Sequence, residues 1–133
     1  MIAFDTNVLI YACDRMAGRR HEVARDLLSS SGEGVVLWQV AVEFIAAFRK
    51  VGGHGGTQEA WEYLQEFLDL LPLILPRRAV LDRARILHVE GQWSSWDALI
   101  TAACLDAGVT RLYSEDLPGR NPPPPLEIIN PFA

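Results

Sequence analysis

The sequence has few of the features that direct a chain out of the cytoplasm or into a membrane. It has only two cysteines, Cys13 and Cys104, both in apolar helix-like contexts without metal-ligand spacing, so we expect buried thiols in a reducing compartment. No apolar run approaches the roughly 20 residues that a membrane-spanning helix needs. The first residues reach an acid at Asp5 without a basic segment, unlike a secretory signal peptide. We therefore expect a cytoplasmic protein that does not associate with membranes.

Positive charge is also scarce, because 12 Lys and Arg residues stand against 17 Asp and Glu residues, for a net charge of −5. Nucleic-acid-binding proteins usually carry excess positive charge, so this balance argues against such a role. Two features weaken that argument. Eleven of the twelve basic residues are Arg, the side chain best suited to bidentate phosphate contact. Cations bound by clustered acids would also make the site less negative than the formal count.

Length and hydrophobic pattern predict one globular domain spanning residues 1–133. We expect strands at 1–4, 35–40, 73–75, 111–114 and 126–129, and helices at 7–13, 21–30, 41–50, 57–71, 79–89 and 94–107, with Thr57 and Ser94 or Ser95 as caps and a glycine break at 52–56. Alternating strands and helices predict a three-layer α/β/α fold with a mostly parallel central sheet of about four or five strands. In such sheets, ligands bind at the carboxyl ends of the strands.

Four acidic residues lie just beyond a predicted strand or in the first turn of a helix: Asp5, Glu43, Asp97 and Asp116. Each has an ordinary structural explanation, as a loop residue, a solvated helix residue, a helix-capping residue or a turn residue. On a parallel sheet, however, these positions converge. We therefore expect the four carboxylates to form one site.

Several carboxylates packed together repel one another, and a divalent cation relieves that repulsion. Ligation by oxygen alone favours Mg²⁺ or Mn²⁺ over Zn²⁺, and none of His21, His54 and His88 has the spacing of a zinc site. The sequence contains neither a Gly-x-Ser-x-Gly elbow nor a Walker A loop. The predicted chemistry is hydrolysis of phosphodiester bonds by a metal-activated water.

At these residues the chain resembles PIN-domain ribonucleases, in particular VapC-type toxins of type II toxin–antitoxin systems. The resemblance covers nearly the whole chain and rests on Glu43 and on four short segments, Ile2–Leu9, Ser95–Ile100, Leu112–Leu117 and Ile129–Phe132. The segment 120–125, with four prolines, departs from the polar, glycine-containing segment of the family.

This resemblance implies a three-layer PIN fold, endoribonuclease activity dependent on Mg²⁺ or Mn²⁺, homodimerisation, and inhibition by a small cognate antitoxin. By position, the acidic quartet of the family corresponds to Asp5, Glu43, Asp97 and Asp116. The supporting residues would be Thr6, Asn7 and Ser114, and Glu115 would either supplement Asp116 or cover the turn.

Alternatives remain open. Arg15, Arg19 and Arg20 could contact RNA phosphates or form a solvated basic loop. Trp93 and Trp96 suit core or dimer packing, or stacking on a base, while Trp61, Tyr63 and Phe67 suit the core or an antitoxin groove. For the whole chain, the alternatives are a PIN nuclease of RNA processing or DNA flaps, and an inactive PIN-fold binding module. A phospho-acceptor domain is disfavoured because the single lysine, Lys50, is wrongly placed.

Overall fold

The central feature of the computed structural model is a parallel sheet of five strands in the order β3-β2-β1-β4-β5. The structure describes residues 1–52, 56–117 and 121–133, with only the backbone for 49–52. The strands are β1 (Ile2–Phe4), β2 (Gly34–Leu37), β3 (Leu73–Ile74), β4 (Arg111–Tyr113) and β5 (Glu127–Ile129). On the central strand, Ala3 is in register with Val35 of β2 and Leu112 of β4.

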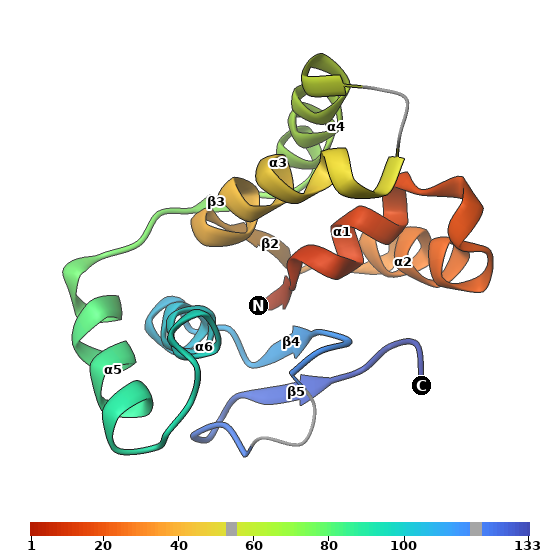
Figure 1. Ribbon diagram of the computed structural model, residues 1–133. Coiled ribbons are helices and arrows are strands. Elements are labelled where there is room, and N and C mark those ends of the chain that lie inside the picture. The colour runs from red at the N-terminus through yellow and green to blue at the C-terminus, as the bar shows by residue number, and fades with distance from the viewer. Residues whose placement is uncertain (53–55, 118–120) are drawn as a thin grey trace.

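Among the described residues, six α-helices connect the strands: α1 (Thr6–Cys13), α2 (Arg19–Ser30), α3 (Trp38–Gly52), α4 (Gly56–Leu70), α5 (Arg78–Val89) and α6 (Ser95–Ala107), with a short 3-10 helix η1 (Arg15–Ala17) after α1. In the sheet, β2 and β3 lie on one side of β1, and β4 and β5 lie on the other side. Right-handed crossovers therefore place α1 to α4 on one face of the sheet and α5 and α6 on the opposite face (Figure 1). This confirms the predicted three-layer α/β/α fold.

The strand order reverses between β1 and β4. In open parallel sheets a crevice forms at such a switch point, beyond the carboxyl ends of the two strands. Asp5 directly follows β1, and Ser114 directly follows β4. The fold thus brings together two segments more than 100 residues apart in the chain.

The predicted strand at 35–40 is wrong at its end, because β2 stops at Leu37 and α3 begins at Trp38 rather than at Ala41. The reason is packing. Val40, Phe44 and Phe48 recur every fourth residue, and all three are buried in the core, so the apolar face of the helix starts within what reads as a β-branched run. Thr57 also lies inside α4 rather than at its cap, since that helix already includes Gly56. Part of the predicted glycine break, residues 53–55, lies outside the described residues.

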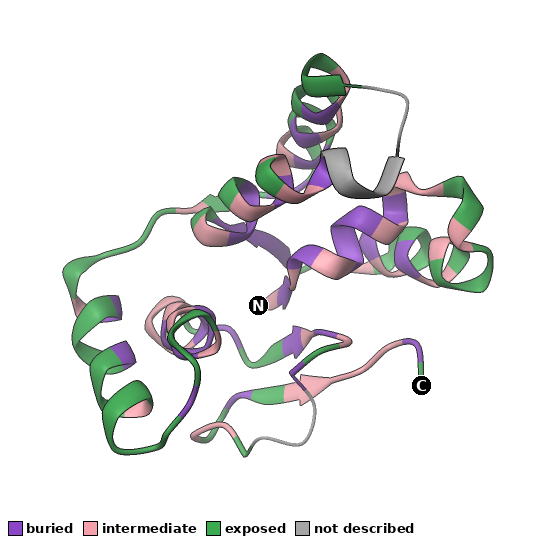
Figure 2. Cartoon of the chain, viewed as in Figure 1, coloured by how far each residue is buried: buried purple, intermediate pink, exposed green. Residues whose placement is uncertain are grey.

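The buried residues form one main core between the sheet and the helices and a smaller cluster between α5 and α6 (Figure 2). Phe67 and Tyr63 pack against Phe44 and Phe48, respectively, whereas Trp61 remains 54% exposed. Trp93 is buried in the smaller cluster, but Trp96 is exposed. Of the aromatic residues considered for the core, Tyr63, Phe67 and Trp93 therefore belong to it, whereas Trp61 and Trp96 are exposed.

Both cysteines are free thiols, with Cys104 buried and Cys13 half-buried. Burial raises the pKa of each thiol to about 12. Neither is therefore a thiolate at neutral pH, which makes both poor nucleophiles. Among the described residues, no helix has the length and apolar character to cross a membrane.

Helix α6 begins and ends at the predicted residues. The hydroxyl of Ser94 accepts a hydrogen bond from the backbone N–H of Asp97 at 3.2 Å, as an N-cap does. At the other end, Gly108 has a φ of 80°, a left-handed conformation that glycine adopts without a steric penalty and that commonly ends helices. The cap places Asp97 in the first turn of α6.

Truncation of a buried side chain on β4 tests this core. Leu112 on β4 is fully buried, so Leu112→Ala should leave a cavity and lower the free energy of unfolding by about 2–5 kcal/mol. The same substitution at Leu70, which is 72% exposed, should change it by less than about 0.5 kcal/mol. Urea denaturation followed by circular dichroism measures both, and equal effects would contradict the described core.

Candidate active site

Asp5 is fixed at the switch point by hydrogen bonds to both of its carboxylate oxygens. Its Oδ1 accepts from the backbone N–H of Thr6 at 2.8 Å, which caps α1, and its Oδ2 accepts from the hydroxyl of Ser114 at 2.7 Å. Ser114 is fully buried, and its oxygen also accepts from the backbone N–H groups of Asp116 and Leu117 at 3.2 Å each. One serine therefore connects Asp5 with the turn that carries Asp116.

Glu43, in α3, also has a hydrogen bond to each carboxylate oxygen. The hydroxyl of Thr6 donates to Oε2 at 2.9 Å, and the side-chain amide of Gln39 donates to Oε1 at 3.0 Å. Because the backbone N–H of Thr6 donates to Asp5 while its hydroxyl donates to Glu43, Thr6 joins these two carboxylates.

The adjacent acids after β4 have different partners. Asn7 donates from Nδ2 to Asp116 Oδ2 at 3.2 Å, and its Oδ1 accepts the backbone N–H of Glu115 at 3.3 Å. The carboxylate of Glu115 instead accepts from the hydroxyl of Tyr11 at 3.3 Å and from Arg20 Nε at 2.8 Å. Asp116 thus belongs to the network around Asp5, whereas Glu115 forms an ion pair with Arg20.

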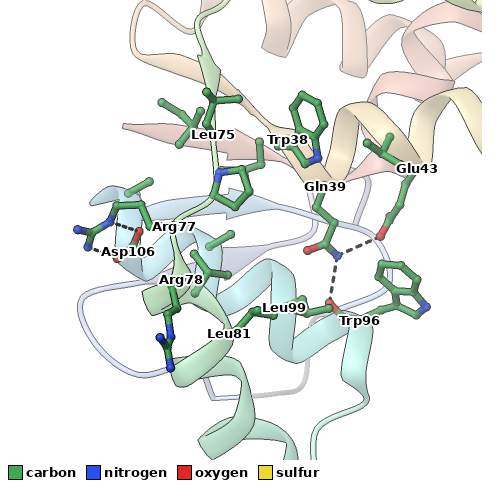
Figure 3. A pocket seen from close by; sticks show the side chains of 17 residues that line it. Trp38, Gln39, Glu43, Leu75, Arg77, Arg78, Leu81, Trp96, Leu99 and Asp106 are labelled. Carbon is green, nitrogen blue, oxygen red and sulfur yellow. Dashed lines mark hydrogen bonds and ion pairs between the residues drawn. The ribbon is translucent and has the colours of Figure 1, made fainter.

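Asp97 lies apart from this network. Among the described residues, its carboxylate has no hydrogen bond or ion pair. It lies in the first turn of α6. The link to the other acids is indirect, since Gln39 also donates to the backbone carbonyl of Trp96, the residue before Asp97, at 3.3 Å (Figure 3).

The pKa of Asp5 is raised above its ordinary value, chiefly because burial disfavours the charged form. Hydrogen bonds from Ser114 and Thr6 act in the opposite direction, while the negative charges of Glu43 and Asp116 raise the pKa further. These three carboxylates therefore lie within electrostatic reach of one another, and each additional negative charge is unfavourable.

The chemistry of the donors fits a hard divalent cation, because Asp5, Glu43, Asp97 and Asp116 offer only oxygen ligands. Two of the histidines have backbone partners: His21 Nδ1 contacts the carbonyl oxygen of Tyr11, and His88 Nδ1 contacts that of Trp93. Within the part of the chain that the structure describes, no three acidic, histidine or cysteine side chains are already arranged to hold an ion.

The three arginines predicted to contact RNA differ in their surroundings. Arg15 is exposed in η1. Arg19 donates to the backbone carbonyl of Phe132 at 3.2 Å, and the guanidinium of Arg20 lies 5.8 Å and 6.0 Å from the ring centres of Tyr11 and Phe132. Arg19 and Arg20 therefore contact the C-terminal segment, and an RNA contact for any of the three stays a prediction.

Two features of this region are not predicted from the sequence: the side chain of Gln39 and an apolar groove beside it. Gln39 lies four residues before Glu43, a spacing that places two side chains together on a helix, but the helix was expected to begin only at Ala41. The groove has a volume of about 460 Å³ and runs between α3, the segment after β3, α5 and α6 (Figure 3). Its lining includes the exposed apolar residues Trp38, Val42, Leu75, Leu81 and Trp96, with Gln39 and Glu43 also in its wall.

Comparisons with known proteins agree with this architecture. Residues 2–117 match the family model of the PIN domain, and the sequence matches no curated protein.

A toxin–antitoxin complex from Klebsiella pneumoniae aligns with a TM-score of 0.69 at 20% identity, covering 99% of this chain and 98% of that chain. VapBC2 from Rickettsia felis, bound to a promoter DNA fragment, aligns with a TM-score of 0.71 at 18% identity, covering 98% of each chain. The sarcin-ricin loop cleaving toxin VapC20 from Mycobacterium tuberculosis gives 0.65 at 19% identity, covering 84% of this chain and 87% of that chain. These likenesses establish a shared fold.

The raised pKa of Asp5 predicts a stability gain on neutralisation. The folded protein holds a proton on Asp5 more tightly than the unfolded chain does, so ionised Asp5 lowers the free energy of unfolding, and this cost disappears as the pH falls below the ordinary value of 3.8. Asp5→Asn keeps an N-capping side chain and should raise the free energy of unfolding at pH 7 by about 1 kcal/mol. The gain should shrink towards pH 3 in urea denaturation experiments.

The matched control is Asp106→Asn. A hydrogen-bonded ion pair with Arg77 lowers the pKa of Asp106, so its stabilising effect is present at neutral pH and is lost on acidification. Asp106→Asn should therefore lower stability at pH 7. A loss of stability at both sites would contradict the electrostatic account of Asp5.

Proposed function

The chain belongs to the PIN domain family, and we propose that it is a metal-dependent endoribonuclease in which Asp5, Glu43, Asp97 and Asp116 bind the cation and carry catalysis. The observation that carries this proposal is the partly buried Asp5, held by Ser114 and Thr6 at the switch point with Glu43 and Asp116 close enough to raise its pKa. A buried acid among like charges is unfavourable for folding alone, so functional selection is the better explanation. The chain would act as a single catalytic domain.

The supporting residues fix the proposed ligands before a cation binds. Ser114 and Thr6 orient Asp5, Thr6 also orients Glu43, and Asn7 orients Asp116. All these donors are neutral, so the site keeps its negative charge. Mg²⁺, or Mn²⁺ in its place, would activate a water molecule for attack on phosphorus and offset the charge that develops on the phosphate.

Other nucleophiles are poorly supported. The two thiols have strongly raised pKa values, and Nδ1 of His21 and Nδ1 of His88 each contact a backbone carbonyl rather than a carboxylate. His54 lies outside the described residues. Hydrolysis by activated water, without a covalent intermediate, is therefore the mechanism that the described residues favour.

The substrate class and the biological role are supported by the neighbours in fold. One of them is a toxin that cleaves the sarcin-ricin loop, and another belongs to a toxin–antitoxin complex. By analogy, we propose that this chain cleaves RNA in the cytoplasm as the toxin of a type II pair and that a small cognate antitoxin inhibits it. The exposed Arg15, with Arg19 and Arg20, would contribute phosphate contacts.

We also propose that the apolar groove beside α3 pairs with the same surface of a second copy. Its exposed Trp38, Leu75, Leu81 and Trp96 form an apolar face of the kind that marks interfaces. The charged residues that line the groove are two acids and two arginines: Glu43, Asp106, Arg77 and Arg78. A two-fold interface pairs a surface with itself, so a surface with no net charge suits this arrangement. The two active sites would then lie beside the interface.

The nuclease proposal predicts cleavage of RNA in the presence of Mg²⁺ or Mn²⁺ and loss of cleavage in EDTA. Asp5→Asn and Asp97→Asn each remove a negatively charged ligand and should reduce the cleavage rate by at least about 100-fold. Cleavage of a fluorescently labelled RNA measures the rate, and circular dichroism verifies folding. Wild-type rates in both variants would refute the mechanism, and Asp82→Asn, on the exposed surface of α5, provides the control.

The two acids after β4 should differ in the same assay. Asp116→Asn should lose most of the activity, because Asp116 is held in the Asp5 network. Glu115→Gln should retain far more, since Glu115 is paired with Arg20 and Tyr11. The reverse order would assign the fourth carboxylate to Glu115.

The dimer proposal predicts that charge placed in the groove separates the two copies. The double variant Leu75→Glu/Leu81→Glu should elute at the monomer mass in size-exclusion chromatography with light scattering, whereas the wild type elutes at twice that mass. Leu70→Glu adds charge at an exposed site on α4 outside the groove and should leave the dimer intact. A monomeric wild type would contradict the dimer but not the nuclease.

A further inference from the structure

Gln39 bridges two elements that carry proposed metal ligands. It is the second residue of α3, and its side-chain nitrogen donates to Glu43 Oε1 at 3.0 Å and to the carbonyl oxygen of Trp96 at 3.3 Å (Figure 3). A primary amide has two N–H groups, so one side chain can supply both hydrogen bonds at once. Glu43 is one turn along the same helix, and Trp96 lies 57 residues away in the first turn of α6.

The bridge is made where the fold provides little other connection. Helix α3 covers one face of the sheet and α6 the other (Figure 1). In the described part of the chain, the bond from Gln39 to Trp96 is the single hydrogen bond that joins these two helices. The carbonyl that it binds belongs to the peptide unit that continues directly into Asp97. Gln39 therefore links the carboxylate of Glu43 to the backbone that carries Asp97.

The chemistry of this bridge is compatible with a cation at the site. A carboxylate oxygen has about two lone-pair directions, so Glu43 Oε1 can accept from Gln39 and still bind an ion. The amide is uncharged and does not neutralise the carboxylate. The Trp96 carbonyl has a second lone pair as well, so its role within α6 is unaffected.

We propose that Gln39 is a positioning residue that sets the separation of Glu43 and Asp97 and thereby the affinity of the site for Mg²⁺ or Mn²⁺. The inference rests on the proposed metal-dependent nuclease. Small divalent cations such as Mg²⁺ require nearly ideal ligand geometry, and residues that orient metal ligands contribute strongly to affinity. Asp97 has no side-chain partner of its own among the described residues, so the position of its backbone matters all the more.

The test measures binding of Mn²⁺ to the full chain without RNA, by electron paramagnetic resonance of free Mn²⁺. Gln39→Met keeps the length of the side chain but removes both donors, and it should weaken Mn²⁺ binding by about 10-fold, at the low end of the effect of orienting residues. In RNA cleavage, the Mn²⁺ concentration for half-maximal rate should rise by the same factor, while kcat at saturating Mn²⁺ stays near the wild-type value.

Gln58→Met is the matched control. Gln58 donates to Glu62 at 3.1 Å, the same four-residue Gln–Glu pair, on the exposed surface of α4. This variant should bind Mn²⁺ as the wild type does. Thermal melting of both variants separates a change in stability from a change in metal affinity, because a purely structural role would lower the melting temperature without changing the Mn²⁺ requirement.

The outcomes distinguish the two proposals. Unchanged Mn²⁺ affinity in Gln39→Met, with normal affinity in the wild type, overturns the role of Gln39 and leaves the nuclease proposal standing. A wild-type chain that binds neither Mn²⁺ nor Mg²⁺ overturns the metal site and this inference with it. Weaker binding in Gln39→Met and Gln58→Met alike shows that the effect does not depend on the bridge to Trp96, and it also overturns the inference.

Discussion

The hydrogen bond from the Ser114 hydroxyl to Asp5 Oδ2 connects the two halves of this fold. It joins the ends of β1 and β4 where the strand order reverses, and it is made by a fully buried side chain. A buried hydroxyl without a partner is costly, and a buried carboxylate is more costly still. The hydrogen bond between Ser114 and Asp5 therefore offsets part of the cost of burying both groups. The turn to Asp116 depends on the same serine, because its oxygen accepts the backbone N–H groups that follow.

The carboxylates are held from several sides by short neutral side chains, and this determines what the site can bind. Thr6 holds both Asp5 and Glu43, and Asn7 holds Asp116. The three acids are therefore positioned by hydrogen bonds from uncharged groups. Burial opposes ionisation of Asp5 and raises its pKa, so we expect the folded protein to be less stable at neutral pH than it would be with a neutral residue there. Such a conflict between stability and local charge is typical of functional sites.

The fold could be predicted from the sequence, as could the proximity of Asp5, Glu43 and Asp116 in the candidate site, because the informative signals are local. Strands such as Ile2–Phe4 are short apolar runs, and Ser94 and Gly108 delimit α6 through backbone chemistry. The start of α3 was mispredicted, because Val40 is apolar in either secondary structure and only packing with Phe44 and Phe48 decides between them. Because the helix was expected to begin at Ala41, the sequence did not predict that Gln39 and Glu43 lie one turn apart on the same helix. The bond from Gln39 to Trp96, like the choice of Arg20 as the partner of Glu115, joins distant segments and cannot be derived from spacing.

The pairing of Glu115 with Arg20 has a consequence for its neighbour Asp116. An arginine beside Asp116 would neutralise the carboxylate and compete with a divalent cation for it. Glu115 accepts Arg20 at 2.8 Å, and the rings of Tyr11 and Phe132 lie near the guanidinium. The ion pair is half-exposed on the arginine side, so it contributes little to stability. Its larger effect is on the distribution of charge, because the cationic Arg20 pairs with Glu115, while Asp116 accepts a hydrogen bond from the uncharged Asn7.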